Sequence, residues 1–191
     1  SAQTLGVMNV LAISGSLRVA SINSAFCRAM AQLAPPPLRV TVHPGLGELP
    51  LFNPDLESHP PSSVQDFRSV VGRADAILIA SPEYAHGISG VMKNALDWLV
   101  SYEGTVYKPV ALINTSPRAH HAYEALREIL QTMSTTIIDE ASIPIPLLGS
   151  CTTEGAMLAT PEVRRAAQAV LTAIAAHLTG PSASGPTFPL A

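Results

Sequence analysis

Residues 12–24, AISGSLRVASINS, join an apolar run to a turn rich in hydroxyl groups and then to a stretch with helical spacing. The apolar run, residues 7–13, has the length of a buried strand. Residues 22–33 repeat apolar positions every three or four residues and end before the prolines at 35–37. A strand, a turn and a helix are therefore expected. Free N–H groups and the dipole at a helix start favour an anion, so the turn is a candidate anion site.

The same alternation of strand and helix continues along the chain. Further strands are expected at residues 39–43, 76–80, 109–114 and 135–138, the last with a reach as far as 143. Further helices are expected at residues 62–73, 91–102, 119–133 and 161–178. Strands this apolar are covered on both faces, which predicts a parallel sheet between two layers of helices. Five such units fit a flavodoxin-like α/β three-layer sandwich with strand order 2-1-3-4-5.

Helix boundaries and the domain limit follow from local signals. Ser62 with Gln65 fits a capping box, and Thr160 before Pro161 fits an N-cap followed by proline at the first helical position. The Pro- and Gly-containing stretch before Thr160 is expected to be a loop. The chain has 191 residues, which suits one domain at 1–180 followed by a C-terminal tail at 181–191 without periodicity.

Composition narrows the class of protein. Hydrophobic residues make up 47 % of the chain and charged residues 13 %, which favours a heavily buried globular domain. The net charge of −3 gives no electrostatic reason for a nucleic-acid or membrane partner. Cys27 lies in an apolar helical stretch and, with Cys151, is expected to be a free thiol. The opening stretch LGVMNVLAI is too short to span a bilayer, so a cytoplasmic protein is expected.

In a sheet of this order, ligands bind beyond the carboxyl ends of the strands, where the first and third strands lie side by side. Three loops meet there: residues 14–23, 81–89 and 114–121. We call them the first, second and third loops. Each carries an unusual set of polar residues, so this edge of the sheet is the expected binding site.

The first loop consists of hydrogen-bond donors without a carboxylate. Its polar side chains are Ser14, Ser16, Arg18, Ser21 and Asn23. Guanidinium and hydroxyl groups at a helix start suit a phosphate monoester. The chain has neither the G-x-G-x-x-G of dinucleotide sites nor a Walker A motif, so a bridging pyrophosphate and nucleoside-triphosphate hydrolysis are disfavoured. The structural alternative is a helix capped by Ser21 beside an exposed Arg18.

In the second loop, Pro82 follows the third strand closely and favours an extended turn, and Glu83 and Tyr84 come next. Gly87 and Gly90 suggest a backbone that something approaches closely. The structural alternative is an ordinary turn, a helix capped by Ser89 and a tryptophan, Trp98, in the core.

Two stretches together resemble a known family. GSLRVASIN, residues 15–23, is similar to the opening motif G-S-L-R-x-x-S-x-N of the NADPH-dependent FMN reductases, which include azoreductases and quinone and chromate reductases. PEYAHGISGVMKNALDWL, residues 82–99, resembles the family segment P-E-Y-N-x-x-x-P-G-x-L-K-N-A-x-D-W-L. KPVALI, residues 108–113, resembles the family's fourth strand, and the likeness extends over residues 7–135.

The resemblance implies a flavodoxin-like fold with non-covalent FMN and with NADPH or NADH as co-substrate. By motif position, Ser14, Ser16, Arg18, Ser21 and Asn23 would hold the phosphate and ribityl chain. The isoalloxazine ring would lie against Pro82, Glu83, Tyr84, Ala85 and the neighbourhood of Ser116. Hydride would pass through the flavin to a quinone, azo compound, flavin or similar small-molecule acceptor in a ping-pong reaction, with no catalytic side chain required. The resemblance also implies a homodimer or homotetramer.

The chain departs from the family pattern at the ring end of the site. Ala85 stands where the family usually has asparagine, and Ser89 where it has proline. The third loop is often rich in glycine, but here it contains Arg118, His120 and His121. These side chains would clash with the flavin edge, point to solvent, or place positive charge near the reduced ring. Metal binding by the two adjacent histidines is disfavoured, because no third ligand has suitable spacing.

Two other functions compete with the reductase. A flavodoxin-like protein that binds FMN without turnover would fit Ala85 and the histidine-bearing third loop. A serine hydrolase with Ser14 or Ser16 as nucleophile is disfavoured, because the chain has no G-x-S-x-G elbow and Arg18 beside the serines indicates an anion site.

Overall fold

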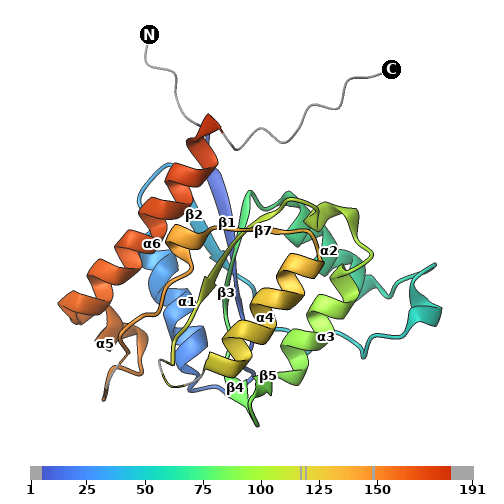
Figure 1. Cartoon of the computed structure of the whole chain (residues 1–191), viewed down its shortest axis with the longest axis horizontal. Coiled ribbons are helices and arrows are strands. Elements are labelled where there is room, and N and C mark those ends of the chain that lie inside the picture. Colours follow the sequence, from blue (N-terminus) through green and yellow to red (C-terminus); the bar gives the residue numbers. More distant parts are fainter. Residues whose placement is uncertain (1–5, 117, 119, 148, 182–191) are drawn as a thin grey trace.

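A computed structural model of the chain describes residues 6–116, 118, 120–147 and 149–181 (Figure 1). Its main sheet has the order β2-β1-β3-β6-β7, and all neighbouring strands are parallel. In chain order these strands are β1 Met8–Ser14, β2 Leu38–Val42, β3 Ala76–Ala80, β6 Pro109–Ile113 and β7 Thr136–Ile137. Counted along the chain without a small separate hairpin, this is the predicted order 2-1-3-4-5, which is confirmed.

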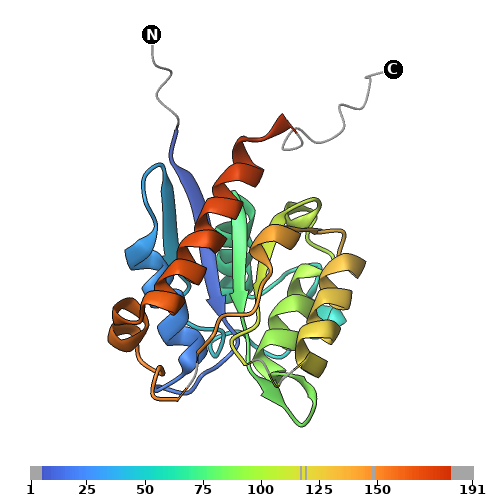
Figure 2. The same ribbon diagram turned by 60° about the vertical axis from the view of Figure 1, so that its left-hand side comes forward.

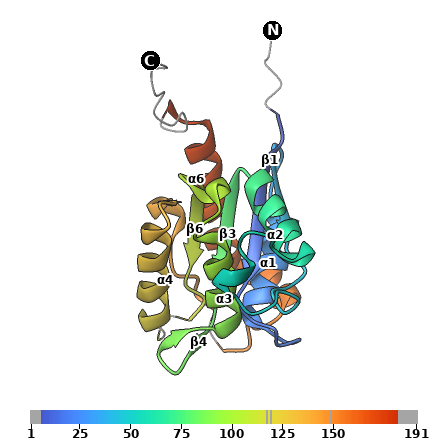
Figure 3. The ribbon, with the colours of Figure 1, turned by 90° about the vertical axis from the view of Figure 1, so that its right-hand side faces the viewer.

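Helices cover both faces of the sheet (Figures 1 and 3). One apolar core lies between the sheet and α1, α5 and α6, and a second lies between the sheet and α2, α3 and α4. Alternate residues of each strand serve the two cores, so that Val10 and Ala12 face one layer while Leu11 and Ile13 face the other. The helices are α1 Ile22–Leu33, α2 Ser62–Arg73, α3 Gly90–Leu99, α4 His120–Thr132, α5 Glu154–Ala159 and α6 Pro161–Thr179.

The fifth strand is shorter than the sequence predicts. β7 ends at Ile137, although the N–H of Ile138 still donates to the Val110 carbonyl at 2.8 Å. The chain then turns into the short 3-10 helix η3, Asp139–Ala141, in which Asp139 pairs with Arg127. The expected reach to residue 143 is therefore wrong, because the chain turns after Ile138 and Asp139 is held by Arg127 of α4.

Two of the predicted helix starts differ in detail. Ser62 begins α2 but does not cap it, and the Gln65 amide donates instead to the Pro60 carbonyl at 2.7 Å, so the capping box is wrong. Thr160 precedes α6 as predicted. Its hydroxyl, however, donates to the Ala156 carbonyl at 2.7 Å and closes the preceding helix. The Gln65 amide and the Thr160 hydroxyl thus donate to backbone carbonyls outside α2 and α6 and do not cap these helices.

Two short elements lie in stretches expected to be loops. Helix α5 is capped by Thr153, which accepts from the N–H of Ala156 at 3.1 Å, and Glu154 at its start pairs with Arg28 of α1 at 3.0 Å. The second element is the hairpin of β4 Glu83–Tyr84 and β5 Gly87–Ile88. Figure 2 shows it projecting from the edge of the sheet toward which the strands of the main sheet point.

Both cysteines are free and buried, which confirms the prediction of a buried free thiol at Cys27. Burial raises the pKa of the Cys27 thiol to about 12, so this group is inert at neutral pH. No helix in the described ranges is long and apolar enough to cross a bilayer. Residues 182–191, most of the predicted tail, lie outside the described residues, and the domain limit at 180 stays a prediction.

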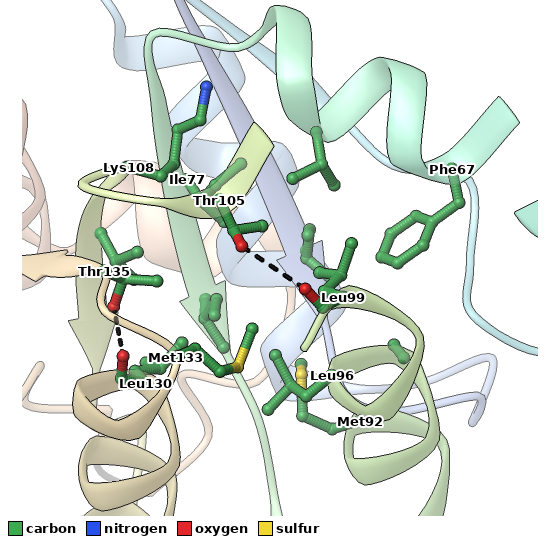
Figure 4. A pocket seen from close by; sticks show the side chains of 15 residues that line it. Phe67, Ile77, Met92, Leu96, Leu99, Thr105, Lys108, Leu130, Met133 and Thr135 are labelled. Atoms are coloured by element: carbon green, nitrogen blue, oxygen red, sulfur yellow. Dashed lines mark hydrogen bonds between the residues drawn. The ribbon is translucent and has the colours of Figure 1, made fainter. Parts of the chain in front are cut away.

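An apolar cavity of about 20 Å³ lies inside the second core (Figure 4). The hydroxyls of Thr105 and Thr135 beside it donate to the carbonyls of Leu99 and Leu130, at 3.5 and 2.7 Å. The cavity is too small for an organic ligand and offers no unpaired polar group to one. It is a packing defect between the sheet and the helices α2, α3 and α4, and the binding site lies elsewhere.

Candidate functional site

Hydrogen bonds hold the three loops together where the strands end. The N–H of Gly15 in the first loop donates to the Ala80 carbonyl at the end of β3, at 2.9 Å. The hydroxyl of Ser89, which ends the second loop, donates to the Gly15 carbonyl at 2.6 Å. The hydroxyl of Thr115 in the third loop donates to the side-chain carbonyl of Asn23. The predicted meeting of the loops is therefore present, and the first loop contacts both of the others.

The serine hydroxyls of the first loop accept hydrogen bonds from the chain itself. Ser14 Oγ accepts from the N–H of Ser16 at 3.2 Å and from the Ser24 hydroxyl at 2.8 Å. Ser16 Oγ accepts from the N–H of Arg18 at 3.3 Å, and Ser21 Oγ accepts from the N–H of Ser24 at 3.2 Å. Each of Ser14, Ser16 and Ser21 thus keeps its own proton for a ligand that accepts hydrogen bonds.

Further donors surround the start of α1. The N–H groups of Ile22 and Asn23 in its first turn have no acceptor among the described residues. The amide nitrogen of Asn23, a residue only 7 % exposed, is also free to donate, because only its oxygen is used. Arg18 is exposed, and no carboxylate in the described part of the chain pairs with it. The two features of the structural alternative, a cap at Ser21 and an exposed Arg18, are both present and leave these donors unused.

Glu83 has a side chain that is already engaged. Its Oε2 accepts from the N–H of Ala122 at 2.9 Å, in the first turn of α4, where the free N–H groups favour a carboxylate. The carboxylate therefore fixes the hairpin against α4. The backbone of Glu83 and the neighbouring Pro82, both half-buried, stay available to line a ligand.

Two residues with left-handed backbone form the tip of the hairpin. Ala85 has φ 50° and His86 has φ 61°, a conformation that glycine, asparagine and histidine adopt more easily than alanine. Tyr84, Ala85 and His86 are exposed. The asparagine that the resembling motif carries at position 85 would suit this backbone. The departure at Ala85 therefore strains the turn in addition to removing an amide.

A column of histidine rings closes the rim of the site. The rings of His86 and His121 stack with centroids 4.5 Å apart, and those of His120 and His121 lie 4.2 Å apart. These exposed rings pack on one another, which connects the hairpin tip to the start of α4. Across the described residues, no group of histidine, cysteine and acidic side chains could hold a metal ion. Ser116 and Arg118 of the third loop, which precede these histidines in the sequence, are also exposed.

One buried hydroxyl in the site has no partner. Ser81 Oγ is inaccessible to solvent and makes no hydrogen bond in the described structure. It lies against Gly15, where an added Cβ would be 2.0 Å from Ser81 Oγ and 3.1 Å from Ser81 Cα. Gly87 and Gly90 have no such close neighbour within the chain, so the expected close approach at these two glycines stays a prediction. Within the chain, the close approach is at Gly15.

Five residues that bond or pack within the site were not predicted as site residues. They are Gly15, Ser24, Ser81, Ser89 and Thr115. Ser24 and Thr115 lie beside predicted residues in the sequence, which is a weak signal. The contact between residues 15 and 81 depends on the pairing of β1 with β3, and no local pattern shows it. The hydrolase alternative gains no support, since the hydrogen bonds of Ser14 and Ser16 involve no histidine.

A family model and two proteins of known sequence agree with one another. The family model described as NADPH-dependent FMN reductase matches residues 8–147. A quinone reductase from Pseudomonas putida is 35 % identical over 131 residues, which are 66 % of this chain and 70 % of that protein. An NAD(P)H-dependent FMN reductase from Pseudomonas aeruginosa is 35 % identical over 129 residues, 66 % of this chain and 69 % of that protein.

Solved structures show the same fold. The flavoenzyme NAD(P)H:(acceptor) oxidoreductase FerB from Paracoccus denitrificans superposes with a TM-score of 0.72 at 26 % identity, covering 90 % of this chain and 99 % of FerB. A flavodoxin from the domain Archaea superposes with a TM-score of 0.55 at 15 % identity, covering 88 % of this chain and 99 % of the flavodoxin. The second likeness supports the flavodoxin-like fold alone.

Proposed function

Because this chain belongs to the NADPH-dependent FMN reductase family, we propose that its three loops hold FMN and serve hydride transfer from NADPH or NADH to a small-molecule acceptor. The first loop would bind the phosphate and ribityl chain through Ser14, Ser16, Arg18, Ser21 and Asn23. The second and third loops would line the ring through Pro82, Glu83, Tyr84, Ala85 and Ser116.

The observation that carries this proposal is the state of the donors in the first loop. Its serine oxygens accept from the chain, while their protons, the Asn23 amide and the Arg18 guanidinium are free. A phosphate monoester with about two negative charges accepts many hydrogen bonds and suits such a set. The residues present therefore fit FMN.

The protein's own part in the reaction is positioning. The chemistry that bound FMN supplies is reversible transfer of hydride between a nicotinamide and an acceptor. The first loop holds the charged end, and the Glu83 carboxylate holds the hairpin against α4 so that its backbone can face the ring. Tyr84 and His86, exposed on the rim, are placed to contact the second substrate. We assign no catalytic side chain.

The acceptor class follows from the relatives. The Pseudomonas putida protein is named a quinone reductase, and FerB is named an NAD(P)H:(acceptor) oxidoreductase. We therefore propose quinones as the first acceptors to try, with azo compounds and free flavins after them. The exposed histidine rim suits planar molecules that accept hydrogen bonds.

An anaerobic absorbance titration tests the proposal. FMN is added to the purified full chain, unbound flavin is removed, and NADPH or NADH is then added without air. We expect flavin absorbance that remains with the protein and bleaches on reduction, and then returns when a quinone is added. A protein that retains no flavin would contradict the binding site. Flavin that stays with the protein but does not bleach would support the alternative, an FMN-binding protein without turnover.

We also propose a homodimer or homotetramer in the cytoplasm. Three large apolar side chains of the first and second loops are exposed, namely Leu17, Val19 and Tyr84, with Val19 97 % exposed. Surfaces of this kind are often covered by a partner. The nicotinamide co-substrate is a cytoplasmic metabolite, which supports the location. Light scattering after size-exclusion chromatography measures the oligomeric state, and cell fractionation tests the cytoplasmic location.

A further inference from the structure

Ser89 lies at the junction of the second loop and α3 and is only 1 % exposed. Its hydroxyl oxygen accepts from the N–H of Met92 at 3.3 Å, which caps α3. Its proton is donated to the carbonyl of Gly15 at 2.6 Å, across 74 residues of sequence. A capping serine needs only the first bond. The second bond connects the helix start to the first loop.

Gly15 is fixed from two directions. Its N–H is held by the end of β3 through Ala80, at 2.9 Å, and its carbonyl is held by Ser89. A side chain at Gly15 would collide with Ser81, so the glycine permits the close approach that the two bonds require. Both peptide planes at Gly15 are thereby oriented by neighbouring elements.

The orientation of Gly15 determines where the phosphate donors point. Ser14 precedes it and Ser16 follows it, and the N–H of Ser16 already bends back to Ser14 Oγ. A rotation of either peptide plane at Gly15 would move these two hydroxyls relative to the start of α1. If the Ser89 hydroxyl were removed, the Gly15 carbonyl would be left buried without its partner, and the loop would have to shift to reach another donor.

The bond from the Ser89 hydroxyl to the Gly15 carbonyl depends on the serine that this chain has at position 89. The resembling motif carries proline at this position, and proline has no hydroxyl to donate. A role for Ser89 in helix capping alone predicts a loss of stability on substitution. A role in orienting the first loop predicts, in addition, a selective loss for ligands that carry a phosphate.

We propose that Ser89 is a positioning residue that fixes the phosphate-binding loop through Gly15 and thereby sets the preference for FMN over riboflavin. The inference rests on the proposed function, because it requires the first loop to bind the phosphate. Riboflavin shares the ring and ribityl chain of FMN and lacks only the phosphate, so the pair isolates the contribution of the first loop.

The test measures dissociation constants of FMN and of riboflavin for the flavin-free full chain by quenching of flavin fluorescence. For Ser89→Ala we expect the FMN constant to rise about tenfold, the loss of one hydrogen bond to a buried group. The riboflavin constant is expected to change less than about twofold. The ratio of the riboflavin constant to the FMN constant therefore falls by nearly the same factor as the FMN affinity. Ser89→Cys carries a weaker donor of similar size. Its FMN dissociation constant is expected to lie between those of the wild type and Ser89→Ala.

Thr153→Ala is the matched control. Thr153 caps α5 by accepting from the N–H of Ala156 and makes no bond to the site loops. Its loss is expected to lower the melting temperature without changing the ratio. An unchanged ratio in Ser89→Ala, or an equal weakening of both flavins, would overturn the inference. If Ser89→Ala does not fold, the same criterion applies to Ser89→Cys. A wild-type chain that binds riboflavin as tightly as FMN would instead overturn the proposed phosphate site.

Discussion

The first loop and the rim of the site are built in opposite ways. In the first loop the polar groups are held by bonds to two other loops, and buried residues such as Ser21 and Asn23 carry them. At the rim, exposed histidines stack on one another and the hairpin turns through Ala85 and His86 in left-handed conformations. The first arrangement suits a fixed recognition of one chemical group. The second suits contact with acceptors that differ from one to the next.

The largest effect is expected at the centre of the first loop. In Gly15→Ala the new Cβ would lie 2.0 Å from Ser81 Oγ, so β1 and β3 must separate or the loop must move. We expect a loss of about 2 kcal/mol in the free energy of unfolding and an FMN dissociation constant raised about a hundredfold. Chemical unfolding and an FMN titration measure the two. Gly155→Ala in α5, where nothing lies within 4 Å of an added Cβ, is the matched control. Equal effects in both variants would show that the close contact of Gly15 with Ser81 is not what the first substitution disturbs.

Arg18→Ala tests the charge of the first loop without disturbing its packing. The side chain is exposed and unpaired within the described residues, so stability is expected to change little. The FMN dissociation constant is expected to rise roughly tenfold or more, because a charge-assisted contact to phosphate is worth about 1.5–3 kcal/mol. Arg39→Ala removes the same charge from an exposed position on β2 and is expected to have no such effect. An FMN constant that is the same in both variants would exclude Arg18 from the phosphate site.

At the rim, one substitution is expected to stabilise the folded protein. Ala85 has φ 50°, and Ala85→Asn replaces it with a residue that tolerates this backbone. We expect the free energy of unfolding to rise by about 0.5–1 kcal/mol in a denaturant titration. Equal or lower stability would show that the turn is not strained and that the contrast with the first loop is weaker than we describe.

The smallest effect is expected from His43, a histidine that holds the turn after β2. Burial lowers the pKa of His43, and its Nδ1 accepts from the N–H of Gly45 at 3.2 Å, a bond that protonation of Nδ1 would break. In the unfolded chain the pKa is about 6.5, so the unfolded state takes up the proton first as the pH falls. Stability is therefore expected to be full above pH 6.5 and to decline below it.

His43→Asn keeps an acceptor for the Gly45 N–H and removes the titration. The measurement is the free energy of unfolding of both proteins between about pH 7.5 and pH 5, a range that brackets the ordinary pKa of histidine. The wild type is expected to lose more stability than the variant. Parallel curves would show that His43 does not couple the turn after β2 to pH.

The fold was largely predictable because its central elements are long or strongly patterned. The continuous apolar run of Ala76–Ala80 and the helical spacing of Ile22–Leu33 appear in the structure with the predicted bounds. The short elements were missed, since tertiary contacts hold them. Helix α5 is held by the pair of Glu154 with Arg28, and the hairpin by the bond between Glu83 and Ala122.

For the candidate site, the residue types were predictable and their connections were not. Arginine, serines and asparagine after an apolar strand indicate an anion site by their chemistry alone. The roles of Gly15, Ser81 and Ser89 arise from segments that lie far apart in the sequence and meet only when β1 and β3 pair. The local spacing of residues in the sequence does not predict such contacts.

The most direct test of the account is a crystal structure of the full chain with FMN. We expect the phosphate group at the start of α1, within hydrogen-bond distance of Ser16, Arg18 and the first-turn N–H groups, with the Ser89–Gly15 bond intact. A complex in which FMN binds elsewhere, or in which the chain's own side chains fill this corner, would contradict the account.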